Sequence, residues 1–379
     1  MDTAAHGGVA VTWDRAGFLA AALLVAVALA MPLGGDAAMG LASRPGLLVA
    51  TLAAAVLFAA APWGRVIPLG LAGVVLGCAV TLALLNDPQV AGSAASGFWA
   101  LTLGTWLAAA LVVTSLAALR PKGAALRRAN DVAIPLLFGA FVFYLWEVAV
   151  RGLGVPSVLM PAPSAMVVRF VSSLPVLGDD FVQTFVRGVL SGYAIGCGSG
   201  FVVAIVAHRY AFLGKGLLPL GNFVSALPIV GIAPIMVMWF GFDWPSKTAV
   251  VAVITFFPML VNTLAGLAAA GAIERDLMRS YGARPAQTLV KLHLPAAMPF
   301  IFNALKINST LALIGAIVAE FFGTPTLGIG FRISTEVGRM ALDMVWAEIA
   351  LSAIAGMAFY GIVALAERAT TFWHPSYRA

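Results

Sequence analysis

Long apolar segments recur along the whole chain, and their length limits the folds that it can adopt. A helix needs about 20 apolar residues to cross the hydrocarbon core of a bilayer. About ten such segments lie at approximately 16–32, 47–63, 66–85, 98–119, 132–150, 181–207, 218–240, 248–270, 300–322 and 344–366. Only 10% of the residues are charged, compared with about a quarter in soluble domains. The sequence therefore predicts an all-α, polytopic membrane protein with about ten transmembrane helices.

A basic linker at residues 121–131 separates the first four apolar segments from the others. It contains Lys122, Arg127 and Arg128, and short loops rich in lysine and arginine stay in the cytoplasm. The basic residues of the other loops fit this rule when both termini are cytoplasmic. We therefore expect an N-terminal four-helix membrane extension over residues 1–120 and a second membrane domain over residues 132–379. The extension has almost no polar residues inside its segments, so we expect it to serve packing, assembly or partner contact.

The most polar stretch of the second half, residues 271–298, lies between two apolar segments. Glu274 and Asp276 precede Arg279 in it, an order that suits the dipole of a short helix. Gly282 follows, and glycine suits the left-handed residue that ends a helix. The stretch therefore predicts a short helix with a defined end.

The same helix has an apolar side. Ile273, Leu277 and Tyr281 are spaced four residues apart, which puts them on one face. This pattern indicates an element that docks onto a partner, and an ordinary basic cytoplasmic loop is the alternative.

Residues 271–298 resemble the cytoplasmic EAA loop in the membrane subunits of ATP-binding-cassette (ABC) importers. In that family an acid and two alanines are followed by a glycine and, near the end, by Leu-Pro. Asp276, Gly282 and Leu294-Pro295 match, whereas Leu277-Met278 stands where the family has the two alanines. The departure bears on which ATPase surface this loop fits. The resemblance implies a coupling helix that sits in a cleft of a separate ATPase subunit. The residues implied in coupling are Glu274, Asp276, Leu277, Met278, Arg279, Gly282 and Ala283.

Further blocks of the same resemblance follow in order from residue 132 onward. They lie at residues 155–166, 226–234, 239–241, 257–266 and 313–320. These blocks resemble the nitrate, sulfonate and taurine group of importer permeases, which includes relatives assigned to thiamine-pyrimidine and riboflavin-type precursors. The resemblance implies a six-helix type I permease core in the bacterial cytoplasmic (inner) membrane, acting as an importer. Residues 276–282 look closer to the pyrimidine-type relatives than to the sulfonate carriers.

The resemblance also implies the partners of the chain. They are an ABC ATPase subunit, in two copies, a periplasmic or lipid-anchored solute-binding protein, membrane lipid and a second copy of this chain. ATP and magnesium would be bound by the ATPase, and no cofactor or metal by this chain. The sequence agrees, because it has no GxxxxGK[ST] phosphate loop and no HExxH or GxSxG pattern. Its four histidines are far apart and are not expected to gather as ligands.

Glycine recurs at every fourth position of segment 181–207. The positions are Gly188, Gly192, Gly196 and Gly200, which share one helix face where another backbone can approach closely. We expect packing against a neighbouring helix of the same chain. A contact that slides during transport is the alternative.

Pro228 and Pro234 interrupt segment 218–240. Proline breaks the hydrogen-bond ladder of a membrane helix, and the freed carbonyl groups need partners or a water-lined cavity. A broken helix that lines a gate and a static kink both fit this pattern. Intramembrane acids are costly, so Glu320 could contact substrate or a gate, or could pair with an arginine such as Arg332. The candidates for the translocation path are Pro228, Pro234, Trp239, Asn262 and Glu320.

Two other functions remain open on the sequence. An ion-coupled secondary transporter would need acids near the membrane midplane and an inverted repeat, and no convincing repeat is visible. A membrane scaffold without transport would leave the polar stretch 271–298 without a purpose. Nucleic-acid binding is not expected, because basic clusters are not combined with base-stacking aromatic residues.

Overall fold

A computed structural model describes residues 5–35, 40–63, 66–119, 123–225, 227–323 and 326–373 of the chain. Within these ranges every regular element is helical, so the predicted all-α class is confirmed. Apolar side chains dominate each long helix because the surrounding solvent is lipid, and helices satisfy every backbone hydrogen bond internally there.

The chain divides by packing into two compact units, residues 1–165 and residues 166–379. The boundary falls inside α6 (Pro163–Ser172), beyond the linker at 121–131. It lies there because α5 (Ala124–Gly152) packs on α4 (Ser96–Ala118) and α3 (Val66–Leu84) of the first unit. The functional boundary at the linker stays a prediction.

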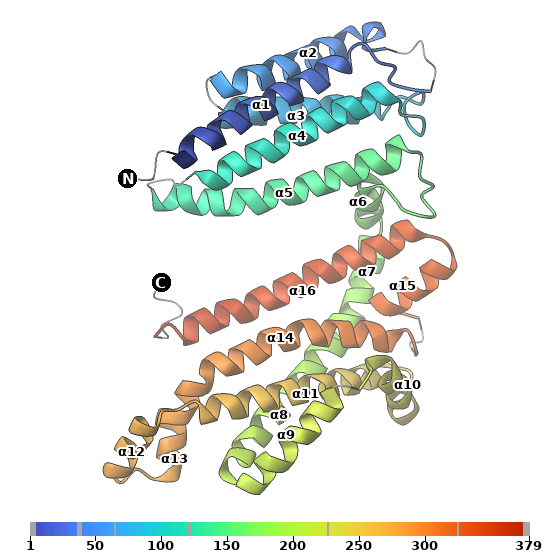
Figure 1. The fold of residues 1–379 in the computed structure, drawn as a ribbon. Helices are drawn as coiled ribbons and strands as arrows, with labels where there is room; N and C mark the ends of the chain where they lie inside the picture. Colours follow the sequence, from blue (N-terminus) through green and yellow to red (C-terminus); the bar gives the residue numbers. More distant parts are fainter. Residues whose placement is uncertain are drawn as a thin grey trace. The chain divides into compact units, whose positions relative to one another are not determined.

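The first unit consists of α1 to α5, which lie side by side (Figure 1). The two helices not yet described are α1 (Ala5–Val27) and α2 (Pro45–Ala60). Phe18, Phe58 and Phe98 fill the core of this unit and are fully buried. Gly77 lets α3 and α4 meet, since a Cβ atom there would lie 2.5 Å from Thr105 Oγ1.

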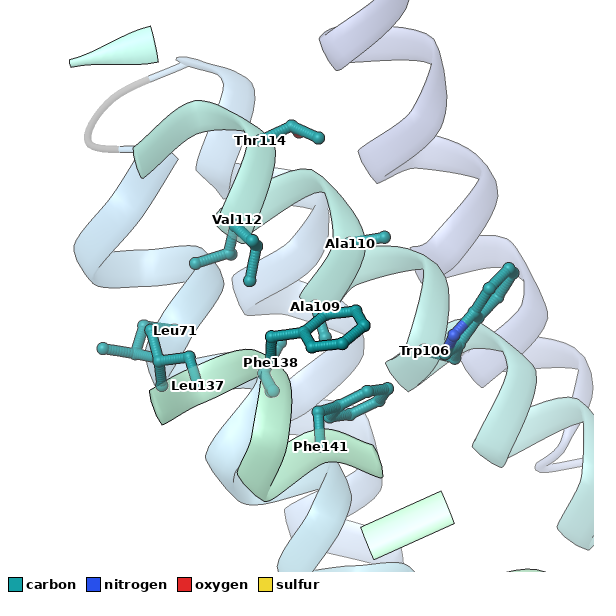
Figure 2. Close-up of a pocket in the computed structure, with 11 residues that line it drawn as sticks. Leu71, Trp106, Ala109, Ala110, Val112, Thr114, Leu137, Phe138 and Phe141 are labelled. Atoms are coloured by element: carbon teal, nitrogen blue, oxygen red, sulfur yellow. The ribbon is translucent and has the colours of Figure 1, made fainter. Parts of the chain in front are cut away.

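An apolar cavity of about 300 Å³ lies in the first unit between α3, α4 and α5. Figure 2 shows Phe138 and Phe141 of α5 facing Val112 of α4, with Leu71 of α3 beside them. A lining of this kind suits lipid chains or apolar side chains, as expected for a membrane-embedded extension.

The second unit is built around α8, α11 and α14, which pack against one another. Its elements are α7 (Leu174–Phe181), a π-helical segment (Val182–Leu190), α8 (Ser191–Arg209), α9 (Ala211–Ser225), α10 (Ile229–Phe240), α11 (Trp244–Ala268), α12 (Ala272–Ser280), α13 (Pro285–Thr288), a second π-helical segment (Leu289–His293), α14 (Leu294–Glu320), α15 (Ile329–Gly338) and α16 (Leu342–Thr370). Within this unit α12 and α13 lie at one end of the long helices, and α10 and α15 lie at the opposite end (Figure 1).

Seven helices in the described ranges are long and apolar enough to cross a membrane. They are Val66–Leu84, Ser96–Ala118, Ala124–Gly152, Leu174–Arg209, Trp244–Ala268, Pro285–Glu320 and Leu342–Thr370. The predicted number of ten is therefore not confirmed. Two of the remaining expected segments form the shorter apolar helices Arg15–Val27 and Pro45–Ala60.

The third remaining segment, residues 218–240, is divided between α9 and α10. Pro228 caps α10 at its N-terminus with an extended backbone, φ −67° and ψ 123°. Proline has no N–H group to continue a helix, and this explains the interruption. Pro234 lies inside α10.

The glycine row of α8 meets α11. Cβ atoms at Gly192, Gly196 and Gly200 would lie 2.5–2.8 Å from backbone carbonyl oxygens of α11, closer than real Cβ atoms come to such atoms. Gly188 has more room, with its nearest neighbour at 3.6 Å. The glycines therefore allow two helix backbones to pack without intervening side chains.

Candidate functional sites: the coupling segment and the outer acidic cluster

We call residues 271–293 the coupling segment, and its first helix is α12. Glu274 lies in the first turn of α12 and Arg279 in the last. Arg279 Nη1 forms an ion pair with Asp276 Oδ1 at 3.2 Å, and both side chains are mostly exposed. Gly282 follows with φ +64°, the left-handed conformation expected from the sequence. The predicted helix and its glycine end are confirmed.

The apolar side of α12 is exposed among the residues that the structure describes. Ile273 is 83% exposed, Leu277 54% and Tyr281 82%. Exposed apolar patches of this kind are typical of surfaces that contact another protein, so the docking role stays a prediction. Among the other residues implied in coupling, Glu274, Asp276, Arg279 and Gly282 are exposed, whereas Met278 and Ala283 are half-buried.

The second half of the coupling segment is joined firmly to the long helices. The Arg284 backbone N–H donates to Gln287 Oε1 at 2.8 Å, which fixes the start of α13. The chain then runs through the π-helical segment directly into α14. His293 Nδ1 lies 2.7 Å from the Leu267 carbonyl oxygen in the last turns of α11. A displacement of α12 therefore reaches both α11 and α14 through short, hydrogen-bonded connections.

Sequence reasoning missed that His208 and His293 meet. Their rings pack edge to face with centroids 4.7 Å apart, a contact that bears on packing and leaves the expectation that the histidines do not gather as ligands a prediction. The two residues are far apart in the sequence, so no sequence pattern indicates that their rings are in contact. Within the described ranges no group of three or more His, Cys, Asp or Glu side chains could hold a metal ion.

A cluster of acidic side chains lies at the other end of the second unit, around Asp180 of α7. We call Asp180, Glu320 and Glu348 the outer acidic cluster; all three are buried. Asp180 accepts hydrogen bonds from the Gly328 backbone N–H at 2.6 Å and from Arg332 Nε at 2.8 Å. The hydrogen bond with the Asp180 carboxylate raises the pKa of the Arg332 guanidinium above its usual value. Asp180 was absent from the sequence-based candidates, although it is the principal partner of Arg332.

Glu320, a translocation candidate, holds the loop that follows α14. Its carboxylate accepts hydrogen bonds from Thr184 Oγ1 at 2.8 Å and from the Gly330 backbone N–H at 2.7 Å. Gly328 has φ +128°, and a Cβ atom there would lie 2.6 Å from Glu320 Oε1. Arg332 pairs with Asp180, and the expected roles of Glu320, contact with substrate or a gate or pairing with an arginine, stay predictions.

Glu348 of α16 completes the cluster, and its position is unusual. It is 0% exposed, and no N–H or hydroxyl group of the described residues donates to its carboxyl oxygens. Its carboxyl group lies within hydrogen-bonding reach of Asp180 instead. Two acids that meet in a buried site repel each other when both are charged.

The other translocation candidates lie on α10, at its N-terminus and on α11. Trp239 on α10 is mostly exposed. Asn262 Nδ2 donates to the Pro258 carbonyl oxygen one turn earlier at 2.8 Å, within α11. Pro228 lies at the interruption between α9 and α10. Their role in a pathway stays a prediction.

Residues 193–376 match the family described as the binding-protein-dependent transport system inner membrane component. This range contains the coupling segment, the contacts of Gly196 and Gly200 with α11, and Glu320 and Glu348 of the outer acidic cluster. The chain belongs to this family. It is an ABC importer permease, and the resemblance seen in the sequence is confirmed.

Three relatives of this permease carry the names of different small solutes. The formylaminopyrimidine transport permease protein ThiX of Halalkalibacterium halodurans is 28% identical over 252 residues, 65% of this chain and 98% of ThiX. SsuC of Bacillus subtilis, provisionally named an aliphatic sulfonates transport permease protein, is 30% identical over 245 residues, 64% of this chain and 88% of SsuC. The riboflavin transport system permease protein RibX of Chloroflexus aurantiacus is 28% identical over 236 residues, 61% of this chain and 86% of RibX.

Proposed function

We propose that this permease carries a small solute into the cell and is driven by a separate ABC ATPase that docks on α12. The observation that supports this most directly is the uncovered row of Ile273, Leu277 and Tyr281. The row lies on a short helix whose segment is joined to α11 by His293 and continues into α14. A motor that moves α12 thereby moves two of the central helices.

The proposed mechanism is alternating access. ATP binding draws two ATPase subunits together, and each carries a coupling segment with it. The backbone contact of Gly192 and Gly196 with α11 allows helices to shift with little steric resistance. The interruption between α9 and α10 gives the wall of the pathway a hinge. Asp180 and Glu320 keep the outer loop attached to α7 and the first π-helical segment during the movement.

The substrate is proposed from the relatives. We favour a pyrimidine-type vitamin precursor, since ThiX is named for formylaminopyrimidine and residues 276–282 resemble that group. A sulfonate, taurine or nitrate is the alternative, because SsuC aligns over a comparable length. In importers of this kind a binding protein delivers the solute, so specificity is shared with that partner.

The proposed assembly is a homodimer of this chain with two ATPase subunits and one periplasmic or lipid-anchored solute-binding protein. Closed two-fold symmetry is the usual solution for a single type of subunit. ATP and magnesium are then held by the ATPase, and this chain supplies no catalytic residue. Both termini face the cytoplasm of the bacterial inner membrane, which puts the basic linker at 121–131 on the same side as the coupling segment.

Solute uptake into vesicles tests the energy source. The permease, the ATPase and the binding protein are reconstituted together, and uptake is measured with ATP and then with an imposed ion gradient in the absence of ATP. Uptake that requires ATP is the expected result. Uptake that persists on the gradient alone would identify an ion-coupled transporter and overturn the proposal.

A further inference from the structure

A basic cavity of about 720 Å³ opens between the end of α8 and the coupling segment. Its charged and ionisable lining consists of Arg209 and His208 from α8, Arg275 and Arg279 from α12, and His293. No carboxylate occurs among its lining residues, all of which lie in the described part of the chain. The cavity therefore concentrates hydrogen-bond donors, and no carboxylate lines its wall.

The two histidines and the three arginines occupy different depths of this cavity. His208 and His293 are half-buried, whereas Arg209, Arg275 and Arg279 are exposed at its rim. A carbonyl oxygen can only accept a hydrogen bond, so His293 Nδ1 carries a proton toward Leu267 O. The ring of His293 is thus held in a fixed orientation in the floor of the cavity.

The cavity and the exposed apolar row lie on opposite sides of α12. Successive residues of an α-helix are rotated by about 100°, so Arg275 and Arg279 point about 180° away from the middle of the row Ile273, Leu277 and Tyr281. A partner that covers the apolar row leaves the arginines free. The cavity therefore lies on the side of α12 away from the apolar row, although Arg279 and Ala283 of its lining are also among the residues implied in coupling.

The Asp276 side chain would compete with a bound anion for Arg279 at the rim of the cavity. Asp276 pairs with Arg279 at 3.2 Å, with side chains 70% and 81% exposed. Exposed pairs of this kind contribute little stability. A stronger anion in the cavity can replace the Asp276 carboxylate as partner of Arg279.

From this geometry we propose that the cavity binds a phosphate oxyanion, either in the headgroup of an anionic phospholipid or as free phosphate. Arginine is the side chain best suited to phosphate, because its planar guanidinium donates two parallel hydrogen bonds. Ile205, Val206 and Leu289 line the same cavity, which suits an amphiphile at the end of a membrane-spanning helix. A bound phosphate joins α8 to α12 through their arginines and holds the coupling helix in place.

Binding is tested on the full-length permease, purified alone in detergent, by native mass spectrometry with dioleoylphosphatidylglycerol and dioleoylphosphatidylcholine. We expect the phosphatidylglycerol complex to dominate. The double variant Arg275→Gln/Arg279→Gln should bind phosphatidylglycerol about tenfold more weakly, because it loses charge-assisted hydrogen bonds. Arg209→Gln, on the opposite wall, should weaken binding independently.

The matched control is Arg284→Gln/Lys291→Gln. It removes the same charge from the same segment, both side chains are exposed, and neither lines the cavity. It should change binding by less than about twofold, since exposed charges outside the cavity act only at long range. Equal losses in the two double variants would show a diffuse surface effect and would overturn the proposal. Unchanged binding in Arg275→Gln/Arg279→Gln together with Arg209→Gln would overturn it as well.

Inorganic phosphate added at millimolar concentration identifies the source of the anion. Displacement of phosphatidylglycerol by phosphate supports a site for the free ion, and failure to displace it supports a site for the lipid headgroup. Either result is consistent with the proposed chemistry only if the cavity variants weaken binding selectively. The measurement needs no ATPase, so its outcome is independent of the proposed transport function.

Discussion

His293 Nδ1 lies 2.7 Å from the carbonyl oxygen of Leu267, and this hydrogen bond joins the end of the coupling segment to the last turns of α11. The coupling segment is therefore attached to the membrane helices at both ends, by the chain at Gly271 and by His293. In α-helices the last carbonyl groups lack partners within the helix, and His293 supplies one for α11. A single side chain thus caps the end of α11 and joins it to the coupling segment.

Loss of the hydrogen bond between His293 and Leu267 should uncouple ATP hydrolysis from transport. In a reconstituted system, His293→Leu is expected to hydrolyse ATP while the solute imported per ATP falls about fivefold, since one hydrogen bond contributes about 1 kcal/mol. His293→Asn keeps an N–H donor at a similar position and should retain most of the uptake. Equal uptake per ATP in the leucine and wild-type proteins would contradict this role.

The apolar row of α12 should determine ATPase affinity. Leu277→Asp introduces a charge into the proposed interface and removes a leucine contact worth about 1.5–3 kcal/mol. We expect at least about tenfold weaker binding of the ATPase, measured by co-purification and by titration of the detergent-solubilised permease. Ala272→Asp carries the same charge on a different side of α12 and serves as the control. The interface would have to lie elsewhere if both variants bound the ATPase equally.

The close packing of α8 on α11 can be tested with two alanine substitutions on one helix. A Cβ atom at Gly196 would lie 2.5 Å from the Ala252 carbonyl oxygen, whereas at Gly198 it would meet nothing within 4 Å. Gly196→Ala should lower the free energy of unfolding by about 1–3 kcal/mol through overpacking. Gly198→Ala should leave it unchanged or raise it slightly, because alanine is the better helix former. Thermal unfolding in detergent distinguishes the two, and equal midpoints would contradict the packing.

The outer acidic cluster predicts opposite effects for two conservative substitutions. Asp180→Asn removes a charge that faces Arg332 and accepts from a backbone N–H, and breaking a buried pair costs about 3–5 kcal/mol. Glu348→Gln replaces a carboxyl group that faces Asp180 and has no N–H or hydroxyl donor among the described residues. The new amide can donate to Asp180, so stability should stay the same or increase. The comparison is made by chemical unfolding of both variants beside the wild type. A strongly destabilised Glu348→Gln would show that this carboxylate has a partner.

The sequence could predict elements whose signal is local. Apolar length identified the membrane-spanning helices, and the order of Glu274, Arg279 and Gly282 predicted α12 and its end. Pro228 predicted the place where segment 218–240 is divided. The number of ten spans is not confirmed, in part because hydropathy does not register where a proline separates one helix from the next.

Contacts between distant residues could not be predicted in this way. Asp180 is one acid among several near an apolar segment, and only the folded chain brings it to Arg332. The burial of Glu348 and the ring contact between His208 and His293 also depend on how the helices pack. Spacing along one helix carries no information about which face of a different helix it meets, so the acidic cluster and the basic cavity required the structure.

The interruption between α9 and α10 has a consequence for the permeability barrier itself. The two helices have 15 and 12 residues, which correspond to lengths of about 22 Å and 18 Å, and neither matches a hydrocarbon thickness of about 30 Å. Residues 211–240 can therefore cross the bilayer only if both helices contribute, and the junction between them then lies in the hydrocarbon core. Lipid tails have no hydrogen-bond donors for the carbonyl groups that lack a helical partner at such a junction. Water or neighbouring polar groups must therefore bind them. Leak of small ions through an idle permease is expected to begin at this point.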